Sequence, residues 1–170
     1  DLELYERICQ KIVDGYKERS SGTVEVKGVS YEYSDKIVLD AAKTIGQIEP
    51  LVFINDHLMT AMKKLGDGFA AGDVSLPHLL KSADVMKQVM GLFESYMQNE
   101  SGEEISDQIS YKGTVILGTV YQDVHSIGKD LTKTLLENYG YRVIDLGVQV
   151  KLQEFVDKAK EYDANAIGMS

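Results

Sequence analysis

Residues 113–170 alternate between short apolar runs and amphipathic stretches, and this alternation constrains the fold more than any other feature of the sequence. Three runs rich in Val, Ile, Ala and Gly read GTVILGTV, YRVIDLGV and ANAIGMS. Two segments with apolar residues at helical spacing separate them. Strands that alternate with helices predict a doubly wound, Rossmann-like parallel sheet with right-handed crossovers.

Residues 1–98 use a different, helix-forming and Met-rich composition. Apolar residues recur at helical spacing in four segments, which predicts a four-helix bundle. The predicted helices cover about 4–13, 38–45, 50–66 and 76–96. Between the first two, residues 17–34 nearly alternate between apolar and polar side chains, which is compatible with a small hairpin or with an extended loop.

The segment 99–112 separates the two compositions. It contains Gly, Ser and several acidic residues with few apolar ones, which is typical of a solvated linker. The sequence therefore predicts a helical bundle domain over 1–98, a linker over 99–112 and a sheet domain over 113–170.

Charge and cysteine content exclude several classes of protein. Eighteen basic residues against 27 acidic ones leave a net charge of −9 without a basic cluster, which argues against a nucleic-acid partner. The single cysteine excludes an intramolecular disulfide and fits a reducing compartment. No apolar run is long enough to span a bilayer and the first residues do not resemble a signal peptide, so we expect a cytoplasmic protein without membrane contact.

The loop after the first predicted strand carries the residues most suited to chemistry. Ligands of doubly wound sheets bind at the carboxyl ends of the strands, which is where Asp123, His125 and Gly128 fall. A metal-ligating histidine needs its second ring nitrogen anchored, usually by a carboxylate, and Asp123 is close enough in sequence to do so. Gly128 permits close approach of the backbone to a ligand, or a conformation closed to other residues. The alternative is an ordinary loop histidine, with Asp123 as a helix cap.

A second cluster lies in the helical domain, around the turn between its last two helices. Phe69, Leu76 and Leu79 flank this turn, where they would form either an exposed apolar lip or part of the bundle core.

Together, these two clusters resemble the cobalamin-binding region of cobalamin-dependent methionine synthase and related corrinoid methyltransferase proteins. The resemblance covers nearly the whole chain. It is carried by an Asp-x-His-x-x-Gly loop, here Asp123 to Gly128, by Ser170 as the serine of a Ser-x-Leu motif, and by LGDGFAAGDVSLPHLLKSADVMKQ as the helical cap. The resemblance implies a helical cap followed by a Rossmann-like domain, with cobalamin (methylcobalamin), and hence cobalt, as the cofactor.

The resemblance also implies roles for single residues. His125 would be the lower axial ligand of cobalt, and Asp123 would hold its other ring nitrogen and adjust the proton of the pair. The rest of the site would lie beneath the corrin and beside its nucleotide tail: Val124, Ser126, Ile127, Gly128 and Ser170. Phe69, Leu76 and Leu79 would cap the upper face.

The sequence departs from the pattern of the resembled family at several points. Gln122 stands where a Gly often precedes the Asp, and Ser126 stands where an Asp often follows the His. Two further strands with their helices would follow Ser170, so the resemblance implies a truncated sheet domain that binds cobalamin weakly or only when completed.

We expect a methyl-carrier module, similar to that of methionine synthase, that cycles between methyl-Co(III) and Co(I) and is not catalytically complete alone. Its expected partners are methyl-donor and methyl-acceptor domains or subunits, and a reactivation partner. The alternatives are a free-standing corrinoid protein of a methanol- or methylamine-type system, or a cobalamin-sensing regulatory module.

Overall fold

The chain divides into two compact units, which are described separately. A computed structural model describes residues 2–102 and 105–170. The helical unit comprises Asp1–Ser110 and the sheet unit Tyr111–Ser170. Residues 103 and 104 of the predicted linker lie outside the described residues, as does Asp1 of the predicted helical domain.

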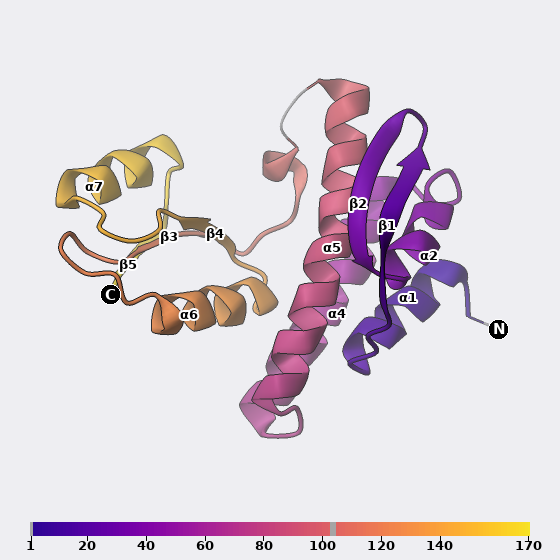
Figure 1. Cartoon of the computed structure of the whole chain (residues 1–170), viewed down its shortest axis with the longest axis horizontal. Coiled ribbons are helices and arrows are strands. Elements are labelled where there is room, and N and C mark those ends of the chain that lie inside the picture. Colours follow the sequence, from indigo (N-terminus) through magenta and orange to yellow (C-terminus); the bar gives the residue numbers. More distant parts are fainter. Residues whose placement is uncertain (1, 103–104) are drawn as a thin grey trace. The chain divides into compact units, whose positions relative to one another are not determined.

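The elements follow one another along the chain as in Figure 1. In order they are α1 (Leu4–Val13), β1 (Arg19–Val26), β2 (Val29–Asp35), α2 (Ile37–Thr44), α3 (Pro50–Val52), the π-helix η1 (Phe53–Leu58), α4 (Met59–Ala71), α5 (Leu76–Ser101), the 3-10 helix η2 (Ser106–Gln108), β3 (Thr114–Gly118), α6 (Ile127–Asn138), β4 (Arg142–Asp145), α7 (Leu152–Glu161) and β5 (Ala166–Met169).

The helical unit is a bundle built on α5, its longest helix. Ser75 caps the start of α5 by accepting a hydrogen bond from the backbone N–H of His78, and Gly102 ends the helix in the left-handed conformation. The buried faces of the helices form one core. Its largest fully buried side chains are Ile8, Ile12, Ile37, Phe53, Ile54, Leu58, Leu65, Leu79 and Leu92, together with Phe93.

Two boundaries of the helical unit differ from those predicted. The helical segment that begins at Pro50 continues past Gly66 to Ala71, where Gly72 adopts φ 83° and closes it. Helix α5 continues to Ser101, so residues 99–101 extend the helix rather than belong to a linker. Asn55 holds the C-terminal segment of the unit through two hydrogen bonds. Its side-chain amide donates to the carbonyl of Gln108 and accepts the backbone N–H of Ser110.

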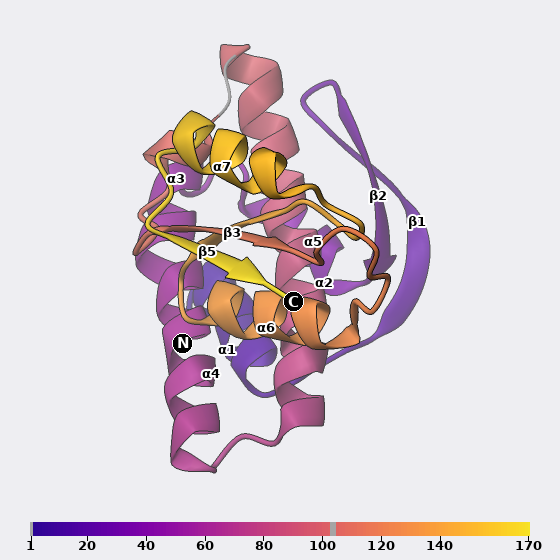
Figure 2. The ribbon, with the colours of Figure 1, turned by 90° about the vertical axis from the view of Figure 1, so that its left-hand side faces the viewer.

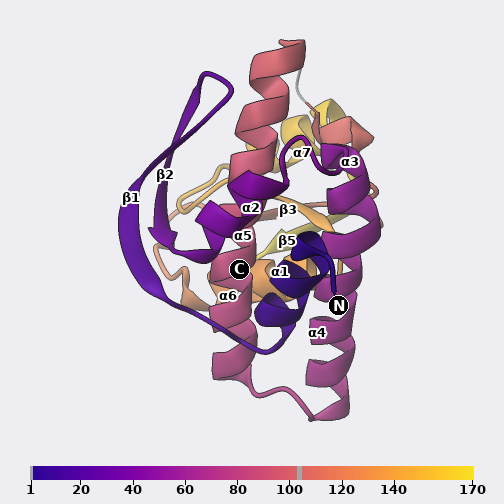
Figure 3. The same cartoon turned by 90° about the vertical axis from the view of Figure 1, so that its right-hand side faces the viewer.

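The segment with two open interpretations is a β-hairpin. Strands β1 and β2 pair antiparallel around a turn at Lys27 and Gly28, and a bulge interrupts the register between Arg19 and Gly22. The hairpin lies along α5 (Figure 3), where the backbone N–H of Ser34 donates to Oε1 of Gln88 at 2.9 Å. Along both strands, half-buried Val and Tyr side chains alternate with exposed, mostly polar residues.

The sheet unit confirms the predicted parallel sheet. Strand order is β4-β3-β5, with both pairs parallel. Helices α6 and α7 lie on opposite faces of this sheet (Figure 2). On the α7 side, Ile116, Val150 and Phe155 form the core of the unit. The three predicted strands and two predicted helices are therefore present, and the fold class is confirmed.

Within the described residues, no helix combines the length and the apolar character needed to cross a membrane.

Candidate functional site

The His125 loop, residues 119–126, joins the carboxyl end of β3 to α6. Neighbouring strands hold it from both sides. The backbone N–H of Val120 donates to the carbonyl of Ser170, after β5, at 2.9 Å, and the N–H of Gln149, after β4, donates to the carbonyl of Asp123 at 3.1 Å. The loop therefore lies where the carboxyl ends of all three strands meet, as the sequence predicted.

Asp123 organises this loop through one carboxylate oxygen. Its Oδ1 accepts the backbone N–H of His125 at 2.9 Å and contacts the ring Nδ1 of His125 at 2.6 Å. These hydrogen bonds, first that of the backbone and then that of the ring, lower the pKa of Asp123. An ionised carboxylate only accepts, so Nδ1 donates to Asp123 and Nε2 is the nitrogen that faces away from this contact.

The imidazole of His125 points away from the protein. Its side chain is 93% exposed, while that of Asp123 is 36% exposed. Asp123 does not cap α6, whose N-cap Ser126 has no side-chain cap, because its carboxylate accepts an amide within the loop and contacts the ring. An anchored ring with its second nitrogen free is the arrangement of a metal-ligating histidine.

The donor set fits a cobalt ion that is already held by a corrin ring. No group of three or more His, Cys, Asp or Glu side chains suited to a metal ion occurs in the part of the chain that the structure describes. A free ion would need such a group, whereas a cobalt already bound by ring nitrogens would take no more than one further ligand from these residues, which His125 would supply. Val124 and Ile127, 59% and 88% exposed, flank His125 with apolar surface suited to a large ring.

Gly128 lies in the first turn of α6 and does not need a conformation reserved for glycine. Its φ is not positive, and a Cβ added there would meet no atom within 4 Å. Of the two reasons expected for this glycine, only close approach to a ligand is compatible with the structure. Gln122, by contrast, adopts φ 73° at the position where the resembled family often has Gly.

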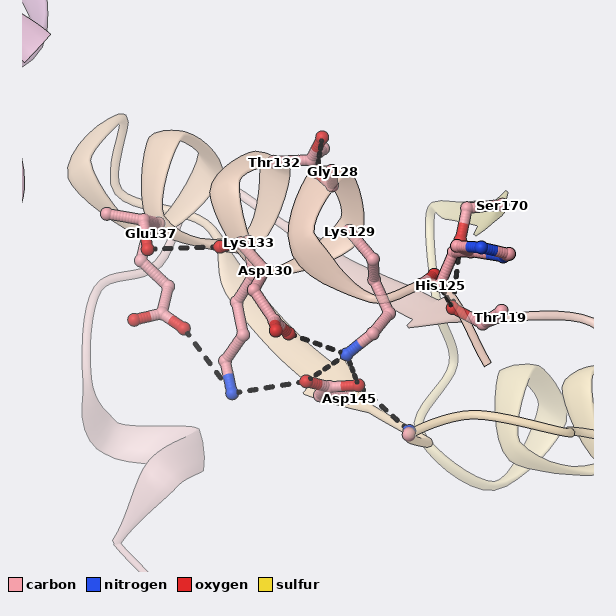
Figure 4. Close-up of polar contacts among 12 residues, drawn as sticks. Thr119, His125, Gly128, Lys129, Asp130, Thr132, Lys133, Glu137, Asp145 and Ser170 are labelled. Carbon is pink, nitrogen blue, oxygen red and sulfur yellow. Dashed lines mark hydrogen bonds and ion pairs between the residues drawn. The ribbon is translucent and has the colours of Figure 1, made fainter. Parts of the chain in front are cut away.

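Thr119, which the sequence did not single out as a site residue, joins two parts of the site. Its buried hydroxyl donates to the carbonyl of His125 at 3.0 Å and contacts Oγ of Ser170 at 2.9 Å (Figure 4). The available signals were its hydroxyl directly after β3 and its place in the GTV that precedes the Asp-x-His-x-x-Gly loop. The structure thus brings Ser170 to the His125 loop, while Ser126 forms the N-cap position of α6 without a side-chain cap.

The three apolar residues predicted to cap the cofactor lie in the helical unit and differ in burial. Phe69 and Leu76 are half-buried, near the turn between α4 and α5. Leu79 is fully buried, in the core of the bundle, so it does not form an exposed lip. The reason is its place on α5, where it falls on the same helical face as the buried Ala83, Met86 and Phe93.

Family comparisons match both units. A B12 binding domain family matches residues 32–94, and a second B12 binding domain family matches residues 113–170. The chain is 37% identical to methionine synthase of Mycobacterium tuberculosis over 169 residues, which are 99% of this chain and 12% of that protein. It is 32% identical to dimethylamine corrinoid protein 3 of Methanosarcina acetivorans over 154 residues, which are 86% of this chain and 69% of that protein.

Among solved structures, the chain is similar to the methanol:cobalamin methyltransferase complex of Methanosarcina barkeri. The TM-score is 0.70 at 26% identity, and the match covers 97% of this chain and 55% of that one. The chain thus spans 12% of the length of methionine synthases and about half to two thirds of the corrinoid proteins it matches. It belongs to the family of B12 binding domains of methionine synthase and the corrinoid methyltransferase proteins, and cobalamin is its cofactor.

Proposed function

We propose that the chain is the cobalamin-binding, methyl-carrying module of a methyltransferase of the methionine synthase type. The observation that carries this proposal is the exposed imidazole of His125, whose Nδ1 lies 2.6 Å from the Asp123 carboxylate at the carboxyl end of β3. When bound, cobalamin supplies a cobalt centre that accepts and gives up a methyl group.

In this proposal, each residue of the loop has a defined task. His125 ligates through Nε2, and Asp123 holds the Nδ1 proton and thereby the ring orientation and the basicity of the ligand. Val124, Ile127 and the backbone around Ser126 and Gly128 would hold the corrin and its tail when the cofactor is bound. Thr119 fixes the carbonyl of His125 and, through Ser170, ties it to the end of β5.

The helical unit has the task of excluding water from the reacting face of the cofactor. Phe69 and Leu76 would provide partly exposed apolar surface for this contact, while Leu79 is buried in the core. Release of this cover would be required whenever a methyl donor or acceptor approaches, which is a gating motion.

Partners of the module supply the methyl donor and the methyl acceptor, and a reactivation partner completes the set. Methionine synthase is favoured because the match to it covers nearly all of this chain. A free-standing corrinoid protein is the second candidate, since this chain spans 69% of a dimethylamine corrinoid protein. An assay with the respective partner proteins would separate the two candidates. Methyl transfer to homocysteine indicates the methionine synthase type, and methyl transfer from methylamines or methanol indicates a free-standing corrinoid protein. We further propose a cytoplasmic location.

A visible spectrum tests the central assignment. Titration of the chain with methylcobalamin, followed by difference spectra so that weak binding is also detected, is expected to show corrinoid absorbance with a histidine as the axial base. His125→Ala should shift the bound spectrum to that of cobalamin without an axial base, at unchanged helical content. His57→Ala is the control, because that ring packs on Tyr5 in the helical unit. An unchanged spectrum for His125→Ala would remove His125 from the ligand position.

A further inference from the structure

A buried lysine lies one turn beyond the His125 loop and has no task in the proposed chemistry. Lys129, on the first turn of α6, is 6% exposed. Its Nζ donates to both carboxylate oxygens of Asp145, each at 2.8 Å, and to Oδ1 of Asp130 at 2.8 Å (Figure 4). The ammonium group is therefore fully engaged and has no access to a ligand of its own.

The partner of this lysine connects it back to His125 through a continuous set of hydrogen bonds. Asp145 Oδ1 also accepts the backbone N–H of Gly147 at 2.9 Å, which holds the left-handed turn after β4. The carbonyl of Gly147 accepts the N–H of Thr119 at 2.9 Å, and the hydroxyl of Thr119 donates to the carbonyl of His125 at 3.0 Å. Lys129 follows His125 by about one helical turn along the chain. The backbone between these two residues therefore closes the path of contacts into a ring around the loop.

Burial of this ion pair has little value for stability as such. Removing two charges from water costs about as much as their attraction returns, so a buried pair contributes little net stability. A pair placed between the start of α6 and the turn after β4 does, however, fix the relative position of these two segments. Both segments hold the His125 loop, which makes the pair suited to setting the geometry of the loop.

We infer that the Lys129–Asp145 ion pair positions the His125 loop, so that Lys129 and Asp145 are positioning residues for the imidazole. This inference rests on the proposed function for the role of His125 as an axial ligand. The effect of the ion pair on the geometry of the loop is independent of the proposed function, because that geometry can be measured without cobalamin.

Lys133 offers a matched control on the same helix. Its Nζ lies 3.6 Å from Oδ2 of Asp145 and 4.0 Å from Oε1 of Glu137, and its side chain is 28% exposed. Lys133→Met removes the same charge from the same carboxylate but leaves the ring of contacts through Lys129 intact.

The first experiment measures amide hydrogen exchange in the cofactor-free chain. Lys129→Met, and Lys129→Met/Asp145→Asn, which leaves no unpaired charge, should speed exchange at Thr119 and Gln149 by about tenfold or more relative to Ile116 in β3. Lys129→Arg should restore most of the protection. Equal acceleration at Ile116, no acceleration, or the same effect in Lys133→Met would overturn the inference.

The second experiment measures the spectrum of the same variants after loading with methylcobalamin. Lys129→Met and the double variant should lower the fraction of bound cofactor with a histidine ligand, while Lys133→Met should match the parent chain. A parent chain that shows no histidine ligation contradicts the proposed function alone, because the exchange measurement still decides the positioning role. Full ligation in both Lys129 variants would overturn the link between the ion pair and the ligand.

Discussion

At the scale of single residues, two glycines at opposite ends of the His125 loop differ in what surrounds them. A Cβ at Gly118 would lie 2.8 Å from the ring of Phe155 and 3.3 Å from Cγ2 of Val150, both in the core of the sheet unit. A Cβ at Gly128 would meet no atom within 4 Å. One glycine thus serves packing within the protein, and the other leaves space beside the site.

Substitution by alanine should separate these two tasks. Gly118→Ala is expected to destabilise the sheet unit by about 1–3 kcal/mol, because a buried aromatic ring must move. Gly128→Ala should leave stability unchanged or slightly raised, because Ala favours the helix, and should weaken cobalamin binding. Urea unfolding followed by circular dichroism, and retention of the corrinoid spectrum, measure the two effects. Equal stability of the two variants would contradict this assignment.

The carboxylate of Asp145 makes stability depend on pH. Burial disfavours its charged form, but hydrogen bonds from Lys129 and Gly147 and the nearby charges of Lys129 and Lys133 outweigh this and lower its pKa below 3.8. A lowered pKa in the folded state stabilises the protein above the pKa of the unfolded state, and this stabilisation is lost as pH falls through the folded value.

Acid titration should therefore destabilise the sheet unit below about pH 4, and more steeply in the parent chain than in Asp145→Asn. Free energies of unfolding measured between pH 7 and pH 3 provide the comparison. Parallel curves for the two chains would show that Asp145 makes no such contribution.

At the scale of elements, the start of α5 depends on a single side chain. Ser75 Oγ accepts the N–H of His78 at 3.3 Å. Ser75 is the last residue of the turn between α4 and α5, near which Phe69 and Leu76 lie. Without the cap, one backbone donor of the first turn loses its partner. The cap thus connects the stability of the bundle with the shape of the predicted apolar lip.

Ser75→Ala is expected to lower the stability of the helical unit by about 1 kcal/mol, whereas Ser75→Asp, which restores an acceptor, should retain it. Thermal unfolding at 222 nm measures the difference. A loss of equal size in both variants would point to a cause other than the cap.

At the scale of the whole molecule, the two units have cores of unequal size. The helical unit buries most of the large apolar side chains, while the sheet unit relies on a few residues around Ile116 and Phe155. The β5 edge of the sheet unit also exposes Ile167 and Met169, at 42% and 54%. A small unit with a small core has little stability in reserve.

Urea should consequently unfold the chain in two steps, the sheet unit first. Cobalamin is expected to raise the free energy of unfolding of the first step only. The increase should be about 2.7 kcal/mol at a free concentration one hundred times its Kd. Amide exchange as a function of urea, read separately at Ile116 and at Leu92, resolves the two steps. A single cooperative transition at both residues would contradict this division.

Sequence alone was sufficient for features that depend on near neighbours. The alternation of strands and helices, the helical faces of the bundle and the Asp123–His125 pair all rest on spacings of a few residues, so periodicity reveals them. The resemblance then identified the cofactor, which the family comparisons confirm. The roles given to single site residues remain predictions.

Tertiary structure decided what depends on residues far apart in the chain. The contact of Thr119 with Ser170, the pairing of Lys129 with Asp145 and the packing of the hairpin on α5 each join segments whose sequences show no sign of one another. Leu79 lies in the core because of the helices around it, although its own segment allowed both positions. Local spacing determines which face of an element is apolar, but only packing decides what that face meets.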